Sequence, residues 1–240
     1  MEPETEVPAA GGPGLAEAAG GFAVGIVFSA IGASIGAAGT GYHAGAPGPT
    51  PLGVVVGGVV GLWIGLMGAV VVAARRCDAR SVASFVGLRV AGAWDLLGGA
   101  AVGLVSQLAL IPLLYLPVEQ LDPSISHQLS GPARQDTGSA HGVVAVTVLL
   151  LILAVGAPLV EEMFFRGLVL RSLSARYHPL VAVAVTAALF ALAHFEAVQF
   201  AGLAAFGLVL GALAHRTGRL GPSIAAHAAF NAAAVISLIH

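Results

Sequence analysis

Long apolar stretches separated by short polar ones run along most of the chain. A helix that crosses a membrane needs about 20 mostly apolar residues. Seven stretches come close to this length, at residues 22–42, 53–74, 96–116, 142–162, 179–195, 198–214 and 222–239. The pattern therefore predicts an all-α fold, a polytopic transmembrane helical bundle of about seven (seven to eight) helices. Glycines recur between residues 53 and 69, which favours close helix packing there.

The composition of the remaining segments divides the chain into three regions. Residues 1–20 are rich in Glu, Pro, Ala and Gly, which predicts a disordered N-terminal segment. Residues 21–141 form an N-terminal transmembrane region, in which 81–97 has the alternation of an interfacial amphipathic helix and 117–141 is a polar loop. Residues 142–240 form the region that holds every candidate motif. We interpret the three regions as parts of one domain.

The composition of the whole chain makes lipid the solvent for much of it. Of the 240 residues, 58% are hydrophobic and 9% are charged, and the mean hydropathy is +0.94. A soluble core of this size does not bury so much apolar surface. The net charge of −2 gives no sign of a nucleic-acid partner. The one cysteine, Cys77, excludes an internal disulfide and is interpreted as a packing residue.

Basic residues are distributed unevenly around the predicted spans. The chain has no lysine, and nine of its ten arginines end the fourth span or follow the second, fourth and sixth; only Arg134 falls on the other side. Because cytoplasmic loops are enriched in arginine, we predict a cytoplasmic N-terminus and an external C-terminus. The lack of lysine beside many Arg and Ala residues suggests a GC-rich bacterial genome, and therefore an integral protein of a bacterial plasma membrane.

Three polar motifs interrupt the apolar stretches of the C-terminal region: Glu161 and Glu162 with Arg166, Phe190 with His194, and His227 with Asn231. An ionisable side chain at the bilayer centre costs roughly 2.5–3.5 kcal/mol on insertion scales, so a charge cluster there is by default a functional site. Residues four apart share one face of a helix, so Glu162 can pair with Arg166 while Glu161 points elsewhere.

Counting from the loops places these motifs at similar depths. Glu161 lies 16 residues before Tyr177 and His194 lies 17 residues after it, so they stand at equal height in an antiparallel hairpin. His227 and Asn231 lie 9 and 13 residues after Gly218, which gives overlapping heights. We therefore expect the polar groups to meet within the bilayer. The fourth helix would then exceed 30 residues, and Pro158 offers a kink or a restart there.

The order Glu-Glu-x-x-x-Arg, Phe-x-x-x-His and His-x-x-x-Asn resembles the CPBP family, the CAAX-protease and bacteriocin-processing (Abi) group of intramembrane endopeptidases. The resemblance covers about residues 142–235, and the small residues Gly167 and 221–224 also look like those of the family. It implies a protease that hydrolyses peptide bonds of membrane-associated substrates, either CAAX-type ends or leader peptides. The lipid bilayer and a membrane-anchored peptide or protein are the implied partners.

The resemblance also implies roles for the motif residues. In this mechanism Glu161 takes a proton from a water molecule that His194 orients. The oxyanion of the tetrahedral intermediate accepts from His227 and from the amide of Asn231. The pocket is shaped by the remaining residues, with Arg166 holding Glu162 and with Phe165 and Phe190 on the substrate side.

The need for a cofactor stays open from the sequence. Glu161, His194 and His227 make a two-histidine, one-carboxylate set that is compatible with zinc, and the family is often labelled metalloprotease. The helical zinc motif His-Glu-x-x-His does not occur in the sequence. The resemblance also implies a glutamate-dependent alternative without metal, which we favour slightly.

Other classes of protein compete with an enzyme. Glu162 with Arg166 is also consistent with a buried structural pair, and lone intramembrane histidines are consistent with interhelical hydrogen bonding. A membrane transporter would use buried Glu, Arg and His as a relay, and a non-catalytic scaffold or immunity protein would keep the fold without turnover. The sequence indicates neither the substrate nor the oligomeric state.

Overall fold

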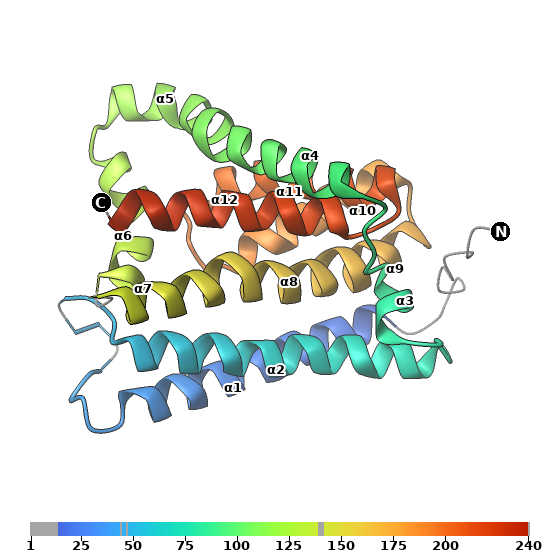
Figure 1. Ribbon diagram of the computed structural model, residues 1–240, viewed down its shortest axis with the longest axis horizontal. Helices are drawn as coiled ribbons and strands as arrows, with labels where there is room; N and C mark the ends of the chain where they lie inside the picture. Colours follow the sequence, from blue (N-terminus) through green and yellow to red (C-terminus); the bar gives the residue numbers. More distant parts are fainter. Residues whose placement is uncertain (1–13, 44, 47, 139–141, 240) are drawn as a thin grey trace.

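The computed structural model describes residues 14–43, 45, 46, 48–138 and 142–239, and these residues contain helices and no strand. The elements are α1 (Leu15–Ala37), α2 (Leu52–Arg76), α3 (Val82–Val86), α4 (Ala93–Val105), η1 (Ser106–Leu110), α5 (Ile111–Leu121), α6 (Ile125–Thr137), α7 (Val143–Leu149), η2 (Leu150–Gly156), α8 (Ala157–Glu162), η3 (Met163–Leu170), α9 (Arg171–Ser174), α10 (Pro179–Leu192), α11 (Phe200–Thr217) and α12 (Gly221–Ile239). The η segments are π-helical. The prediction of an all-α bundle is confirmed (Figure 1).

Five helices in the described part of the chain are long and apolar enough to cross a membrane: Leu15–Ala37, Leu52–Arg76, Ala93–Leu121, Val143–Ser174 and Phe200–Thr217. The other two predicted spans fall on α10 and α12. Helix α10 has only 14 residues, or about 21 Å at 1.5 Å per residue, which is short for a hydrocarbon core of about 30 Å. It ends before His194, because the chain turns there.

Glycines hold α1 and α2 close together as an antiparallel pair (Figure 1). Gly32 faces the backbone of Gly57, and Gly36 faces that of Gly53. A Cβ atom at Gly61 would collide with the carbonyl of Phe28. The close packing expected from the glycines between residues 53 and 69 is therefore present, and it depends on glycine having no Cβ atom at these positions.

Helix α1 begins at Leu15, seven residues before the predicted span. Its first turn is held by Glu17, whose carboxylate accepts from the backbone N–H of Gly14 at 2.6 Å and pairs with Arg76 of α2. The last part of the predicted disordered segment, from Leu15 to residue 20, is therefore helical. Residues 1–13 lie outside the described residues.

The arginine-rich loops meet at one end of the bundle, as their distribution predicts. The guanidinium of Arg171 donates to the carbonyls of Phe85 (2.9 Å) and Gly218 (3.4 Å). Arg219 forms a two-point pair with Asp95 at 2.5 and 2.6 Å. Gly87, at φ 71°, ends α3 after five residues, so the interfacial helix expected over 81–97 is one short helix followed by the start of α4.

Two further segments differ from their predictions. The expected polar loop 117–141 contains the end of α5 and the whole of α6. The amide of Gln199 holds α6 against the bundle by donating to the carbonyl of Leu129 at 2.8 Å. The fourth helix is continuous from Val143 to Ser174, with Pro158 inside it. The π-helical segments η2 and η3 lie on either side of α8, so the backbone changes at Pro158 are absorbed without a restart.

We expect Gly61→Ala to lower the stability of the protein by about 1–3 kcal/mol, because the new methyl group forces α1 away from α2. Gly68→Ala in the same helix is the matched control. A Cβ at Gly68 meets nothing within 4 Å, so this change should be neutral or stabilising by up to about 1 kcal/mol. Thermal unfolding in detergent measures both, and equal melting temperatures would contradict the packing argument.

Candidate active site

The three predicted motifs come together between η3, α8, α10, α11 and α12. Glu162 and Arg166 project from the long fourth helix, Phe190 from α10, and His227 from α12. All four side chains are almost completely buried, with exposed fractions of 0%, 1%, 1% and 3% in this order. Contacts therefore join Glu162, Arg166, Phe190 and His227, whereas the meeting of Glu161 with His194, which counting placed at equal height, stays a prediction.

Glu162 is the centre of the charged part of the cluster. One carboxylate oxygen, Oε1, accepts from Nη1 of Arg166 at 2.8 Å and from Nδ1 of His227 at 3.0 Å. Arg166 also donates from Nη2 to the carbonyl of Gly207 on α11 at 3.2 Å. One buried carboxylate thus connects three helices, which is the arrangement that an ionised group needs inside a protein.

Glu161 points to a different side of the helix, as the sequence predicts. Its side chain keeps 17% exposure, and its Oε2 lies 3.9 Å from Nε2 of His227. This separation is too long for a direct hydrogen bond. Among the described residues, Oε2 of Glu161, Oε2 of Glu162 and Nε of Arg166 are buried without a hydrogen-bond partner. The cluster therefore contains hydrogen-bonding atoms that its internal bonds do not use.

Aromatic rings separate and orient the two imidazoles. Phe190 contacts His194 with ring centroids 4.8 Å apart and His227 with centroids 5.6 Å apart. The guanidinium of Arg166 lies 4.5 Å from the same ring centroid, a cation–π contact. Phe165 packs edge to face against Phe190 at 5.3 Å. The phenylalanines predicted beside the substrate are therefore part of the packing that holds the charged groups.

His194 is held by the turn that ends α10. Its Nδ1 lies 2.8 Å from the carbonyl of Phe190, one helical turn earlier. The next residue, Phe195, has φ 56° and 74% exposure. A bulky residue in the left-handed region is strained, and such strain is concentrated at functional sites. The His194 ring is half-buried beside this turn.

Asn231 contacts the fourth helix at an earlier segment than His227 does. Its amide Nδ2 donates to the carbonyl of Leu153 at 2.8 Å, within η2. In a π-helix the backbone bonds run from residue i to i+5, and such wide turns are frequent at functional sites. Asn231 therefore fixes α12 against the fourth helix, and its role as an oxyanion donor stays a prediction.

Two members of the cluster could not be predicted from the sequence. The carbonyl of Gly207 accepts from Arg166, but a backbone acceptor leaves no trace in the residue type. Phe206 contacts His227 edge to face with centroids 5.7 Å apart, and it is one of many apolar residues in its span. Both lie on α11, which carries no polar motif.

The proposed zinc ligands do not form a metal site in the described part of the chain. No group of three or more His, Cys, Asp or Glu side chains is arranged there to hold a metal ion. Glu161 lies 3.9 Å from His227, while His194 contacts the Phe190 ring and the Phe190 carbonyl. The donor set therefore does not fit a two-histidine, one-carboxylate centre.

Comparison with known proteins agrees with the motifs. Residues 143–233 match the family described as Type II CAAX prenyl endopeptidase Rce1-like, which confirms the resemblance to the CPBP family. The match covers α7 to α12 and includes every site residue, and it leaves α1 to α6 outside. No curated protein matches the chain, and no solved structure matches it. The apolar helices and this match together indicate an integral membrane protein whose residues 143–233 are similar to a family of CAAX endopeptidases.

We expect Arg166→Met to destabilise the protein by about 3–5 kcal/mol, because it leaves the buried Glu162 carboxylate without its main partner. The double variant Glu162→Gln with Arg166→Met removes both charges and should recover part of that loss. Arg216→Met, at an exposed arginine, is the matched control and should change little. Thermal unfolding in detergent measures all three, and additive effects of the two site substitutions would argue against the pair.

Proposed function

We propose that the protein is an intramembrane endopeptidase in which Glu161 and the site histidines activate water. The observation that carries this proposal is the placement of two adjacent glutamates in unlike surroundings. Glu162 is fully buried and paired with Arg166 and His227, while Glu161 keeps partial exposure and an oxygen without a bond. The first acid organises the site, and the second is left for proton transfer.

In this mechanism Glu161 is the general base. Its Oε2 and Nε2 of His227 are 3.9 Å apart, a separation that one water molecule can bridge with two hydrogen bonds of about 2.8 Å. His194, which contacts the same Phe190 ring as His227, orients the attacking water in this proposal. Proton transfer from water to Glu161 then accompanies attack on the peptide carbonyl.

The protonation of His227 follows from its bond to Glu162. A carboxylate only accepts, so Nδ1 of His227 carries the proton in that bond. In the neutral ring Nε2 is then an acceptor that suits a bound water. As a donor to the oxyanion, which is its second proposed role, His227 needs a proton on Nε2 as well. Asn231, next along the same face of α12, is proposed as the second donor.

The proposed substrates are membrane-associated peptides or proteins, processed at CAAX-type ends or at leader peptides. This class follows from the family match over residues 143–233. A non-catalytic scaffold, an immunity protein or a transporter is the competing reading. The free oxygen of Glu161 favours an enzyme, because a structural pair would need only Glu162 and Arg166.

We expect Glu161→Gln and His194→Ala each to reduce kcat/KM by at least about 100-fold, the usual contribution of a positioned acid or base. Purified protein acting on a library of membrane-anchored peptides gives the measurement. Glu196→Gln, two residues beyond His194, is the matched control and should keep its activity. Full cleavage by either site variant would exclude the mechanism, and no cleavage by the unaltered protein on any peptide would favour the scaffold.

We expect cleavage to persist in the presence of a chelator, because Glu161, His194 and His227 do not form a ligand set among the described residues. The measurement is the initial rate before and after dialysis against a chelator. The control is the same treatment followed by addition of zinc. A rate that is lost on chelation and restored by zinc would assign the protein to the metalloproteases.

A further inference from the structure

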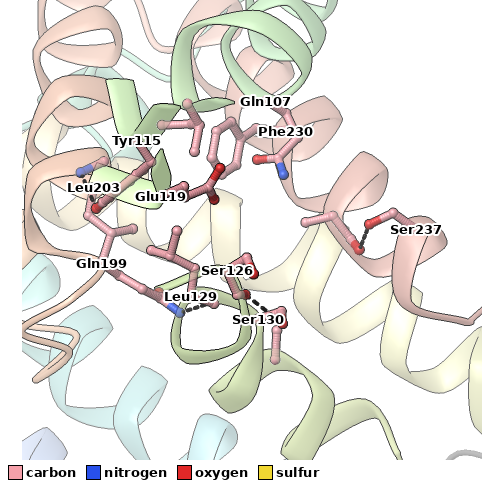
Figure 2. Close-up of a pocket in the computed structure, with 14 residues that line it drawn as sticks. Gln107, Tyr115, Glu119, Ser126, Leu129, Ser130, Gln199, Leu203, Phe230 and Ser237 are labelled. Atoms are coloured by element: carbon pink, nitrogen blue, oxygen red, sulfur yellow. Dashed lines mark hydrogen bonds between the residues drawn. The ribbon is translucent and has the colours of Figure 1, made fainter. Parts of the chain in front are cut away.

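A second cavity lies at the end of the bundle opposite the arginine-rich loops, between α5, α6, α11 and α12 (Figures 1 and 2). It has a volume of about 290 Å³, close to the lower limit of about 300 Å³ for ligand pockets. Four residues at a spacing of four line one wall: Gln107, Ile111, Tyr115 and Glu119. This spacing is a single helix face, so the third span turns a stripe with three polar side chains toward the cavity.

Four hydroxyl groups around this cavity already donate their protons to backbone carbonyls. Tyr115 donates to the carbonyl of Val198 at 2.7 Å. Ser126, Ser130 and Ser237 donate to backbone carbonyls at 3.0, 3.0 and 2.7 Å. A hydroxyl has one proton and two lone pairs, so these oxygens have only acceptor capacity left for a ligand. Tyr115 has used part of that capacity, because the backbone N–H of Gly202 donates to its oxygen at 3.0 Å.

The amide of Gln199 is only partly committed. Its nitrogen donates one N–H to the carbonyl of Leu129 at 2.8 Å, which leaves its second N–H as a donor and its oxygen as an acceptor. The rest of the lining is apolar and includes Leu203 and Phe230. With the amides of Gln107 and Gln199 as its remaining donors, the cavity is an apolar pocket in which acceptors outnumber donors.

Glu119 adds a negative charge to these acceptors. Figure 2 shows its side chain among the lining residues, and it is half-buried. Within the described residues, the carboxylate makes no hydrogen bond or ion pair. Arg134, the basic residue of α6, instead donates to the hydroxyl oxygen of Ser130 at 3.2 Å. A half-buried carboxylate without a counter-charge favours a cationic ligand.

We propose that this cavity binds the side-chain ammonium of a lysine carried by a membrane-associated peptide. An ammonium has three donors and no acceptor, and its four-carbon stem suits the apolar walls. The chain itself contains no lysine, so a lysine in the cavity comes from another molecule. A phospholipid headgroup fits less well, because its phosphate requires donors and the lining offers only the amides of Gln107 and Gln199, beside the negative charge of Glu119.

The cavity is in contact with the packing around the candidate active site. Phe230 lines the cavity and stacks on Phe206 with ring centroids 3.9 Å apart, and Phe206 contacts His227. Phe230 lies three residues after His227, and Ser237 lies ten residues after it on the same helix. That the bound peptide is also the substrate rests on the proposed function, whereas the binding itself does not.

Binding of a fluorescent pentapeptide, acetyl-Leu-Leu-Lys-Leu-Leu-amide, to the full chain in detergent tests the proposal by anisotropy. We expect the lysine peptide to bind at least about 10-fold more tightly than peptides with norleucine or ε-acetyl-lysine at the same position, because both lack the charge. Glu119→Gln should abolish this preference, and Ala234→Leu should abolish it by filling the cavity. Asp122→Asn, outside the cavity at the same end, should leave it unchanged.

Equal binding of the three peptides, or an undiminished preference in folded Glu119→Gln or Ala234→Leu, would overturn the proposal. Displacement by phosphatidylethanolamine but not by phosphatidylcholine vesicles would assign the cavity to a lipid amine and would also overturn it. The melting temperature of each variant reports whether it is folded. Because Glu161→Gln keeps this cavity intact, it should bind the lysine peptide normally, so a failure of catalysis and a failure of this site are distinguishable.

Discussion

The carboxylate of Glu162 is the constraint on which the C-terminal half of the molecule depends. It has no access to water, and removing an ion from water costs several kcal/mol even after relaxation. Arg166 and His227 must therefore approach it. The bond from Arg166 lies within the fourth helix, and the bond from His227 holds α12 against that helix. The same demand places Phe190 under the guanidinium and the Gly207 carbonyl beside it. The free-energy cost of burying this charge therefore determines how the fourth helix, α10, α11 and α12 pack together.

The N-terminal half is held by a different kind of contact. Helices α1 and α2 approach through glycines, where dispersion between backbones replaces charge and hydrogen bonding. The two halves are joined where the loops cross, through the bonds of Arg171 to Phe85 and Gly218 and through the pair between Arg219 and Asp95. Residues 143–233, which match the family, are therefore held in place partly by residues outside the match.

Periodicity and spacing were enough to predict the helices, the separation of Glu161 from Glu162, and the meeting of the motifs. These features are local, because a helix fixes which residues share a face and how far each lies from a turn. The early start of α1, the helix α6 and the short α10 were not predictable in this way. They depend on Glu17 meeting Arg76, on Gln199 reaching Leu129 and on a strained turn at Phe195, all of which are contacts or dihedral angles without a residue pattern. The acceptor role of the Leu153 carbonyl is equally invisible, since any residue would supply it.

Because of the π-helical segments η2 and η3, a change in the length of the fourth helix has different effects at different positions. A turn that closes from residue i to i+5 contains one residue more than an ordinary turn. Losing one residue from Leu150–Gly156 would therefore still leave a helix, but everything before the loss would rotate by about 100° relative to Glu161. The Leu153 carbonyl would leave the amide of Asn231, and α7 would present another side to the lipid. Homologues that differ in length by a single residue here are consequently expected to compensate on α12.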